Sequence, residues 1–155
     1  MRSGNDNSGP ATEYVTATIG GQLFGLPIAR VQDVFIPDHL TSVPLSSPYI
    51  AGILNLRGRI ITVIDMRHRL GVPQKIGDQQ PMAIGIEHRG ESYGLLIDEI
   101  GEVMTLPDSL RESNPVNLDI RVAEVSSGVF RLASQLLVSL NIDRVLHVGA
   151  QIKAA

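Results

Sequence analysis

The sequence contains no cysteine and no tryptophan, and only 4% of its 155 residues are aromatic. Without cysteine, disulfides, thiol catalysis and cysteine metal sites are excluded, which fits a reducing compartment. The shortage of aromatic residues means that Ile, Val and Leu must form most of the core. No apolar run reaches the length of a membrane span, and the polar N-terminus lacks the apolar segment of a secretory signal. We therefore expect a cytoplasmic protein without membrane insertion, with a disordered arm at residues 1–12 and a tail at residues 149–155.

An excess of charge of one sign is also missing, because the formal net charge is only −3. This balance provides no general attraction to nucleic acid. The four histidines are far apart and lack metal-ligand spacing, and no phosphate-binding glycine loop or nucleophile elbow occurs. The sequence therefore predicts no metal, no cofactor and no catalytic residue, and the protein is expected not to be an enzyme.

Two blocks of the sequence occur twice in the same order, which indicates an internal duplication. Gly21–Val34 ("GQLFGLPIARVQDV") matches Gly90–Val103 ("GESYGLLIDEIGEV"), with five of 14 positions identical. The apolar pattern of Gly52–Leu70 then matches that of Gly128–Leu146. Two ordered matches are harder to attribute to chance than one. We predict a single domain over residues 13–148 that consists of two related halves.

Short alternating stretches and frequent turns predict a mostly β protein. Tyr14–Ile19 alternates apolar and polar residues, and Gly20-Gly21 is expected to form a hairpin turn, as is Arg89-Gly90. Ile60–Ile64 is apolar at nearly every position, which predicts a strand buried on both faces. The pattern favours two small β-barrels side by side, because barrels leave few open sheet edges.

Two short helices are expected between these strands. Pro27 is typical of a helix start, and the apolar side chains of Ile28, Val31 and Phe35 share the spacing of a helical face. Ser47-Pro48 has the pattern of an N-cap followed by proline, which predicts a short helix to about Leu54.

Three segments resemble a known family: "FGLPIARVQDV", "AGILNLRGRIITVIDMRHRLG" and "YGLLIDEIGEV". In this order they resemble the CheW family of chemotaxis coupling proteins, from about Tyr14 to Val148. The resemblance implies two five-stranded SH3-like β-barrel subdomains with short helices and a shared apolar core. It also implies a non-enzymatic adaptor that joins methyl-accepting chemoreceptors to the histidine kinase CheA, whose regulatory domain has the same fold. Such an adaptor is cytoplasmic and is recruited to membrane-associated receptor arrays.

The turn Arg57-Gly58 is the main candidate for partner binding. The matching positions of the second half are Ala133 and Ser134, so the repeated fold does not demand Arg-Gly here. One interpretation is that Gly58 provides a positive φ and that Arg57 is a solvated turn residue. The other is that the turn presents a planar guanidinium to a partner. The resemblance favours the second, because it implies a role for this arginine in receptor and kinase coupling.

The resemblance also implies a receptor-binding groove that accepts the helical hairpin tip of the receptor. Its predicted residues are Val31, Asp33, Met82, Ile100 and Val103. A groove between two barrels offers a helix an apolar trough with a polar rim. The residues alone are also compatible with a plainer interpretation, in which Val31 belongs to the core and Asp33 ends a helix.

Two acidic positions could be mistaken for functional ones. Asp65 follows an apolar strand and could suggest catalysis, but its counterpart Asn141 cannot perform acid/base chemistry. We predict that both side chains bond local backbone. The pair Asp98-Glu99 aligns with Ala29-Arg30 and is expected to be solvated.

The cluster Arg57, Arg59, Arg67 and Arg69 supports an alternative, a small β-barrel that binds nucleic acid. Few aromatic residues accompany these arginines, and the strand between them looks buried. A steep loss of affinity with salt would identify that alternative. A CheW-like coupler in a non-flagellar chemosensory pathway is the other alternative.

Overall fold

The computed structural model describes residues 9–44, 46–73 and 81–147, which form ten strands, three short α-helices and two 3-10 turns. The strands are β1 (Ala11–Ile19), β2 (Gln22–Pro27), β3 (Val31–Phe35), β4 (Ile50–Leu56), β5 (Arg59–Asp65), β6 (Met82–His88), β7 (Glu91–Ile97), β8 (Glu99–Pro107), β9 (Ser126–Arg131) and β10 (Leu136–Leu140). The helices are α1 (Met66–Arg69), α2 (Ile120–Glu124) and α3 (Ile142–Val145), and the 3-10 turns are η1 (Ile28–Arg30) and η2 (Asp108–Leu110). Most of the predicted arm (residues 1–8) and the predicted tail (149–155) lie outside the described residues.

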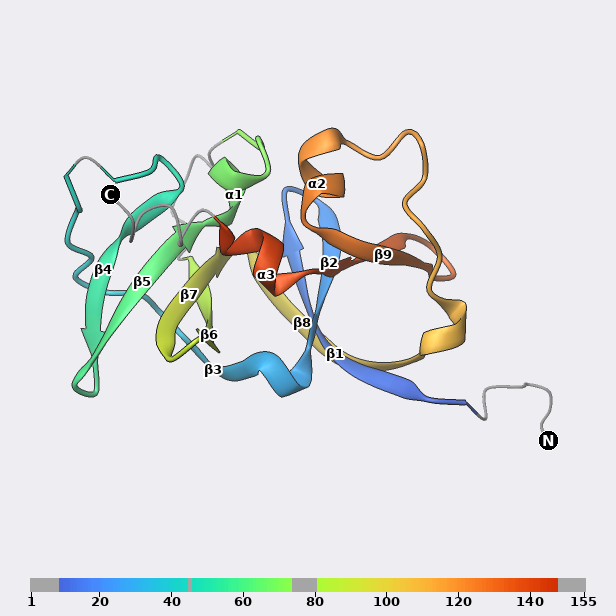
Figure 1. Ribbon diagram of the computed structural model, residues 1–155, viewed down its shortest axis with the longest axis horizontal. Coiled ribbons are helices and arrows are strands. Elements are labelled where there is room, and N and C mark those ends of the chain that lie inside the picture. Colours follow the sequence, from blue (N-terminus) through green and yellow to red (C-terminus); the bar gives the residue numbers. More distant parts are fainter. Residues whose placement is uncertain (1–8, 45, 74–80, 148–155) are drawn as a thin grey trace.

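The strands form two five-stranded sheets that lie side by side (Figure 1). The first sheet has the order β8-β1-β2-β10-β9 and the second has the order β3-β6-β7-β5-β4. Matching β1–β5 with β6–β10 converts one order into the other, which supports an internal duplication. Each sheet mixes strands of both halves, joined by the parallel pairs β2–β10 and β5–β7. The sequence did not indicate this exchange, which makes the two halves structurally inseparable.

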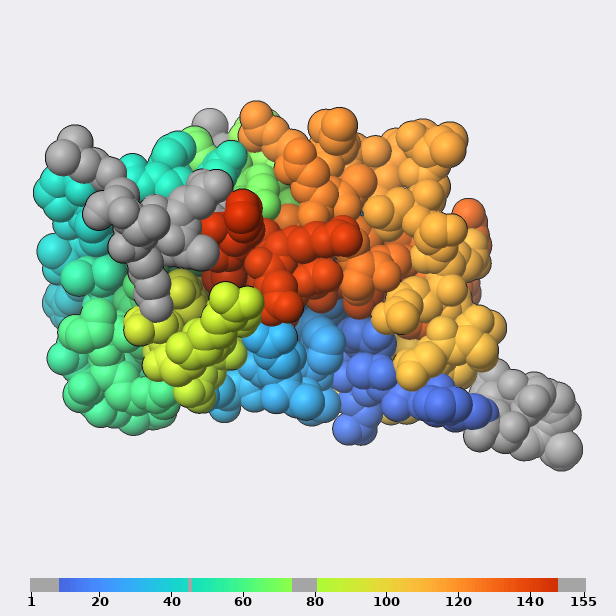
Figure 2. Space-filling view, viewed as in Figure 1, coloured from blue at the N-terminus to red at the C-terminus, as the bar shows by residue number. Residues whose placement is uncertain are grey.

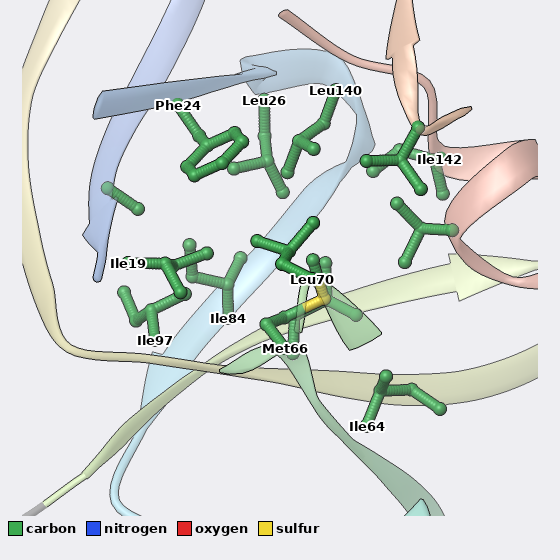
Figure 3. Close-up of a cluster of buried hydrophobic side chains, with 14 of the residues drawn as sticks. Ile19, Phe24, Leu26, Ile64, Met66, Leu70, Ile84, Ile97, Leu140 and Ile142 are labelled. Atoms are coloured by element: carbon green, nitrogen blue, oxygen red, sulfur yellow. The ribbon is translucent and has the colours of Figure 1, made fainter. Parts of the chain in front are cut away.

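A large apolar core lies between the sheets and contains residues of both. Figure 3 shows Phe24 and Leu26 of the first sheet facing Ile84 of the second, with Met66 of α1 beside them. All four side chains are at most 1% exposed. Burying each such side chain contributes about 1.5–3 kcal/mol. The mostly β fold and the shared apolar core therefore agree with the prediction.

The helices α1 and α3 begin in the same way. The Asp65 carboxylate accepts a hydrogen bond from the backbone N–H of His68 at 3.2 Å, and the Asn141 side chain accepts one from the N–H of Arg144 at 3.1 Å. Both residues are N-caps that satisfy otherwise unpaired donors. The prediction of a local backbone role is confirmed for both positions.

The two predicted helices are wrong. Only the single turn η1 follows Pro27, and Val31–Phe35 is the strand β3. The sequence does not show the alternation of apolar and polar residues that is typical of a strand, because the polar Asp33 lies half-buried on the same face of β3 as Val31 and Phe35. Likewise, Ser47 caps a single turn by accepting from the N–H of Tyr49 at 3.3 Å, and β4 follows immediately.

The strand β5 is less buried than predicted. Ile61, Val63 and Ile64 are at most 6% exposed, but Ile60 is 59% exposed. The predicted burial on both faces therefore holds for Val63 and Ile64, whereas Thr62 is only partly buried and Ile60 faces outward. Among the described residues, no helix is long and apolar enough to cross a membrane.

Candidate functional site

The turn between β4 and β5, at the lower left of Figure 1, contains Arg57 and Gly58. The pairing of Leu56 with Arg59 leaves only these two residues in the loop, and their φ angles are 54° and 82°. Two positive φ angles are typical of the hairpin turn whose twist matches the flanking strands. The N–H of Gly58 donates to the Asn55 side chain at 3.0 Å. The turn is therefore well defined, while the Arg57 side chain is 76% exposed.

Arg57 forms an ion pair with Asp33, the other polar residue predicted for this site. Nη1 of Arg57 lies 3.3 Å from Oδ2 of Asp33, whose side chain is 34% exposed. Asp33 is on β3 and Arg57 follows β4, and these strands are the opposite edges of the second sheet. The sheet thus curls until its two edges approach each other. Gly85, opposite Asp33 on β6, leaves the space for the carboxylate, because a side chain there would collide with it.

The ion pair, rather than the backbone strain, distinguishes Arg57 from other turn residues. Arg89 has a similar φ of 53° in the turn between β6 and β7, so a positive φ alone does not indicate a functional residue. An exposed pair such as Arg57–Asp33 contributes only about 0.2–1 kcal/mol to stability. Its main effect is to restrict the direction in which an exposed guanidinium points.

The predicted groove residues are arranged around the edge of the shared core. Val31, Met82 and Ile100 are partly buried and pack against this core. Val31 begins β3, Met82 begins β6 and Ile100 lies in β8. Val103, also on β8, is 50% exposed. The structure therefore joins Asp33 to Arg57 directly, whereas Val31, Met82 and Ile100 each pack against the shared core and Val103 lies exposed on β8.

An apolar groove beside the turn was not found from the sequence. It has a volume of about 420 Å³. Its lining consists of the apolar residues Phe35, Ile36, Ile53, Leu54, Leu56 and Ile60 together with the polar residues Asp38, His39, Thr41 and Asn55. Ile36 and Ile60 are 47% and 59% exposed, which is unusual for isoleucine. No pattern in the sequence indicated this groove, because Ile60 begins an apolar run that is typical of a buried strand.

A second missed feature is the buried ion pair Arg67–Asp98. Arg67 donates to both carboxylate oxygens, at 2.8 and 2.7 Å, and Asp98 also accepts from the N–H of Gly20 at 2.8 Å. The hydrogen bond to Asp98 raises the pKa of Arg67, and the negative charge of Asp98 acts in the same direction. The side chains are 17% and 10% exposed, so the prediction that Asp98 is solvated is wrong. The repeat gave no sign of the pair, because the counterparts of Arg67 and Asp98 are Asp143 and the uncharged Ala29.

The four clustered arginines do not form one basic surface. The side chains of Arg67 and Arg69 are 17% and 10% exposed, and each has a carboxylate partner. Arg59 donates to Ser92 at 2.8 Å and Arg57 pairs with Asp33. This distribution does not favour the nucleic-acid alternative, which requires a continuous track of exposed cations.

Comparison with known proteins identifies the family. The CheW-like domain family matches residues 13–149. The chain belongs to the CheW-like family. It is 31% identical to the chemotaxis protein CheW of Bacillus subtilis over 103 residues, which cover 66% of each protein. It is 26% identical to the chemotaxis protein CheW of Thermotoga maritima over 137 residues, 87% of each protein.

A solved structure agrees with this assignment. The crystal structure of the scaffolding protein TtCheW from Thermoanaerobacter tengcongensis superimposes with a TM-score of 0.74 at 26% identity. The match covers 84% of this chain and 89% of that one. The predicted family, the fold with two β subdomains and the role of a chemotaxis coupling adaptor are therefore confirmed.

Proposed function

We propose that this chain is a non-enzymatic scaffold that binds the cytoplasmic tip of a methyl-accepting chemoreceptor and the regulatory domain of the kinase CheA. It acts in the cytoplasm, at membrane-associated receptor arrays. The pair Asp33–Arg57 carries the proposal, because the exposed guanidinium is biased toward one direction at a turn where the other half of the chain has Ala133. Simultaneous binding of both partners would let kinase activity follow the state of the receptor.

The receptor surface consists of Val31, Asp33, Met82, Ile100 and Val103, with the turn Arg57-Gly58 at its edge. Of the apolar members, Val31, Met82 and Ile100 pack against the core shared by the two sheets and would offer a docked helix an apolar contact. Asp33 and Arg57 provide the polar rim, and their charges would set the register of a docked helix. Exposed Val103 would bury its side chain only when the receptor is bound.

The kinase surface is the apolar groove at Ile36, Ile53 and Ile60. Burying its exposed isoleucines against a partner would contribute about 25 cal/mol of binding free energy per Å² of apolar area removed from water. The regulatory domain of CheA resembles this chain in fold, so a similar apolar sheet edge on the kinase is a matched partner. The groove adjoins the turn through Leu56, which supports a role of Arg57 in binding both partners.

The sharpest test replaces Arg57 without harming its turn. Arg57→Asn keeps the turn, because Asn-Gly is the preferred sequence for two positive φ angles. Arg89→Asn makes the same change in the turn between β6 and β7, which has nearly the same geometry. We expect Arg57→Asn to weaken receptor binding at least 10-fold, as loss of about 1.4 kcal/mol would, and to reduce receptor control of the kinase. Arg89→Asn should bind like the wild type.

Binding is measured by pull-down and calorimetry with a receptor cytoplasmic fragment and with a CheA regulatory domain. Thermal melts verify that each variant is folded. Equal affinities for the two arginine variants would contradict the role of the turn. Failure of the folded wild type to bind either partner would refute the adaptor proposal itself.

Two exposed residues test whether the surfaces are separate. Val103→Asp should weaken binding of the receptor fragment and leave kinase binding intact, whereas Ile60→Asp should do the opposite. Both side chains are at least half exposed, so neither change should disturb the core. Equal losses for both partners in each variant would mean a single shared surface.

The identity of the kinase paralogue that the wild type captures would also distinguish a flagellar from a non-flagellar pathway.

A further inference from the structure

The buried arginine Arg69, at the end of α1, is the least expected residue of the structure. It is only 9% exposed, and it is the one charged residue in the buried part of the described chain. Nη2 donates to the carbonyl of Arg144 at 3.2 Å, and Nη1 lies 3.9 Å from Glu124. Among the described residues no acceptor reaches Nε, and the guanidinium carbon lies 5.3 Å from the centre of the Tyr49 ring. Burying a guanidinium with so few acceptors lowers the stability of the folded protein. Such a residue is therefore a candidate for binding an anion.

The internal repeat shows that the fold does not require an arginine here. The counterpart of Arg69 at the end of α3 is Val145, which is completely buried in the core. The flanking pairs Met66/Ile142 and Leu70/Leu146 are apolar and buried in both halves. Valine therefore fills the same architectural position without a charge.

The guanidinium of Arg69 opens onto a pocket of about 430 Å³ where the three short helices meet. The lining residues are Arg69, Glu124, Asp143, Arg144 and His147. In Figure 2 the red residues of α3 lie beside the orange residues of α2 on the face that contains this pocket. The two acidic side chains are 58% and 68% exposed, so their carboxylates lie toward the solvent.

We propose that this pocket binds a dianionic oxyanion such as a phosphate group, with Arg69 as its buried anchor. Arg69 provides a buried positive charge whose Nη1 faces only the weakly held Glu124, and Arg144, whose Nη1 donates to the carbonyl of Ser126 at 3.2 Å, adds a second cation at the pocket wall. The Asp143 carboxylate has other partners, because Oδ1 lies 3.3 Å from Nδ1 of His88 and 4.0 Å from Nη1 of Arg30. Glu124 is the competing acceptor, held weakly at 3.9 Å, and an incoming dianion would displace it from Arg69. This site is separate from the proposed receptor and kinase surfaces.

The test measures binding of inorganic phosphate at constant ionic strength, with chloride as the reference salt. Phosphate should raise the melting temperature of the wild type in a saturable way, by about 3–6 °C at ten times its Kd. Backbone amide NMR signals that shift should belong to α1, α2 and α3. Acetate should be at least tenfold weaker because it carries one charge. Arg131→Ala, which removes an exposed arginine, should keep the full response.

Two variants separate binding from general salt effects. Arg69→Val takes the side chain of its counterpart and should lose the saturable response, although phosphate also stabilises proteins by a non-saturable exclusion effect. If that variant does not fold, Arg69→Lys provides the same comparison, since it keeps the charge and loses the planar donors. Glu124→Gln should tighten phosphate binding several-fold, an effect that a purely structural arginine would not show. An identical response to phosphate and chloride in the wild type, or an equal response to acetate, would overturn the proposal.

Discussion

Removing the side chain of Arg67 should destabilise the protein more than removing any exposed arginine. Arg67 on α1 binds Asp98 with two hydrogen bonds, and the same carboxylate binds the backbone of Gly20 in the first sheet. Arg67 also donates to the carbonyl of Pro73. The pair therefore connects the helix after the second sheet to a hairpin of the first. Arg67→Ala would leave the Asp98 carboxylate, only 10% exposed, with its charge uncompensated.

The size of the loss follows from this burial. Removing one partner of a buried ion pair typically lowers the free energy of unfolding by about 3–5 kcal/mol. Asp98 retains its hydrogen bond from Gly20 and some contact with water, which reduces the expected loss to about 3 kcal/mol. For a domain of this size, that loss corresponds to a fall of about 6–12 °C in melting temperature. The control Arg131→Ala breaks a pair with Glu112 whose side chains are 64% and 47% exposed, and it should cost less than about 1 kcal/mol.

Circular dichroism in urea and calorimetry measure both variants, because the chain has no tryptophan for fluorescence. The difference in the free energy of unfolding between wild type and Arg67→Ala should not change between about pH 6 and pH 9. The hydrogen bond to Asp98 raises the pKa of Arg67 above its already high unfolded value, so its stabilising effect is complete throughout this pH range and is lost only as the pH rises through the folded-state pKa. A loss no larger than that of Arg131→Ala, or one that varies over this pH range, would refute the reasoning.

Two further substitutions test local features. Asp65→Asn should leave the stability nearly unchanged, because Asn141 caps α3 in the same way, whereas Asp65→Ala should cost about 1 kcal/mol in urea unfolding; equal losses would contradict the capping role. Gly85→Ala should push the Asp33 carboxylate away from Arg57 and thereby weaken receptor binding, while Gly90→Ala, whose added carbon meets no atom, should strain only its own turn. NMR signals of the turn between β4 and β5 should shift only in Gly85→Ala, and an unchanged signal there would contradict the steric argument.

Local chemistry was the part of the structure that the sequence predicted best. The turns at Gly20-Gly21 and Arg89-Gly90 follow from residues that tolerate positive φ, and both form as expected. The caps at Asp65 and Asn141 follow from short polar side chains at the end of a strand. These features depend on residues that are close in the chain, so a pattern of neighbouring residues is enough to indicate them.

Long-range features were missed because no local pattern encodes them. The exchange of strands between the halves depends on which strands pair, and the alternation within a strand is the same for any partner. The contact between Asp33 and Arg57 depends on the curl of the second sheet, which brings β3 and β4 together from opposite edges. Asp33 also hid β3 itself, because a carboxylate on its half-buried face resembles a helix end rather than a strand.

The duplication offers a way to separate the demands of the fold from other demands, because each position has an internal counterpart in nearly the same surroundings. Positions that keep their chemistry in both halves, such as the two N-caps, are explained by the architecture. Arg57 and Arg69 differ from their counterparts Ala133 and Val145, so the architecture does not explain them. Natural proteins often accept some loss of stability at functional residues. Arg69→Val, which takes the counterpart residue, and Arg57→Asn, which keeps the positive φ of the turn, should therefore keep or gain stability while they lose binding, and this combination identifies a residue that folding does not require.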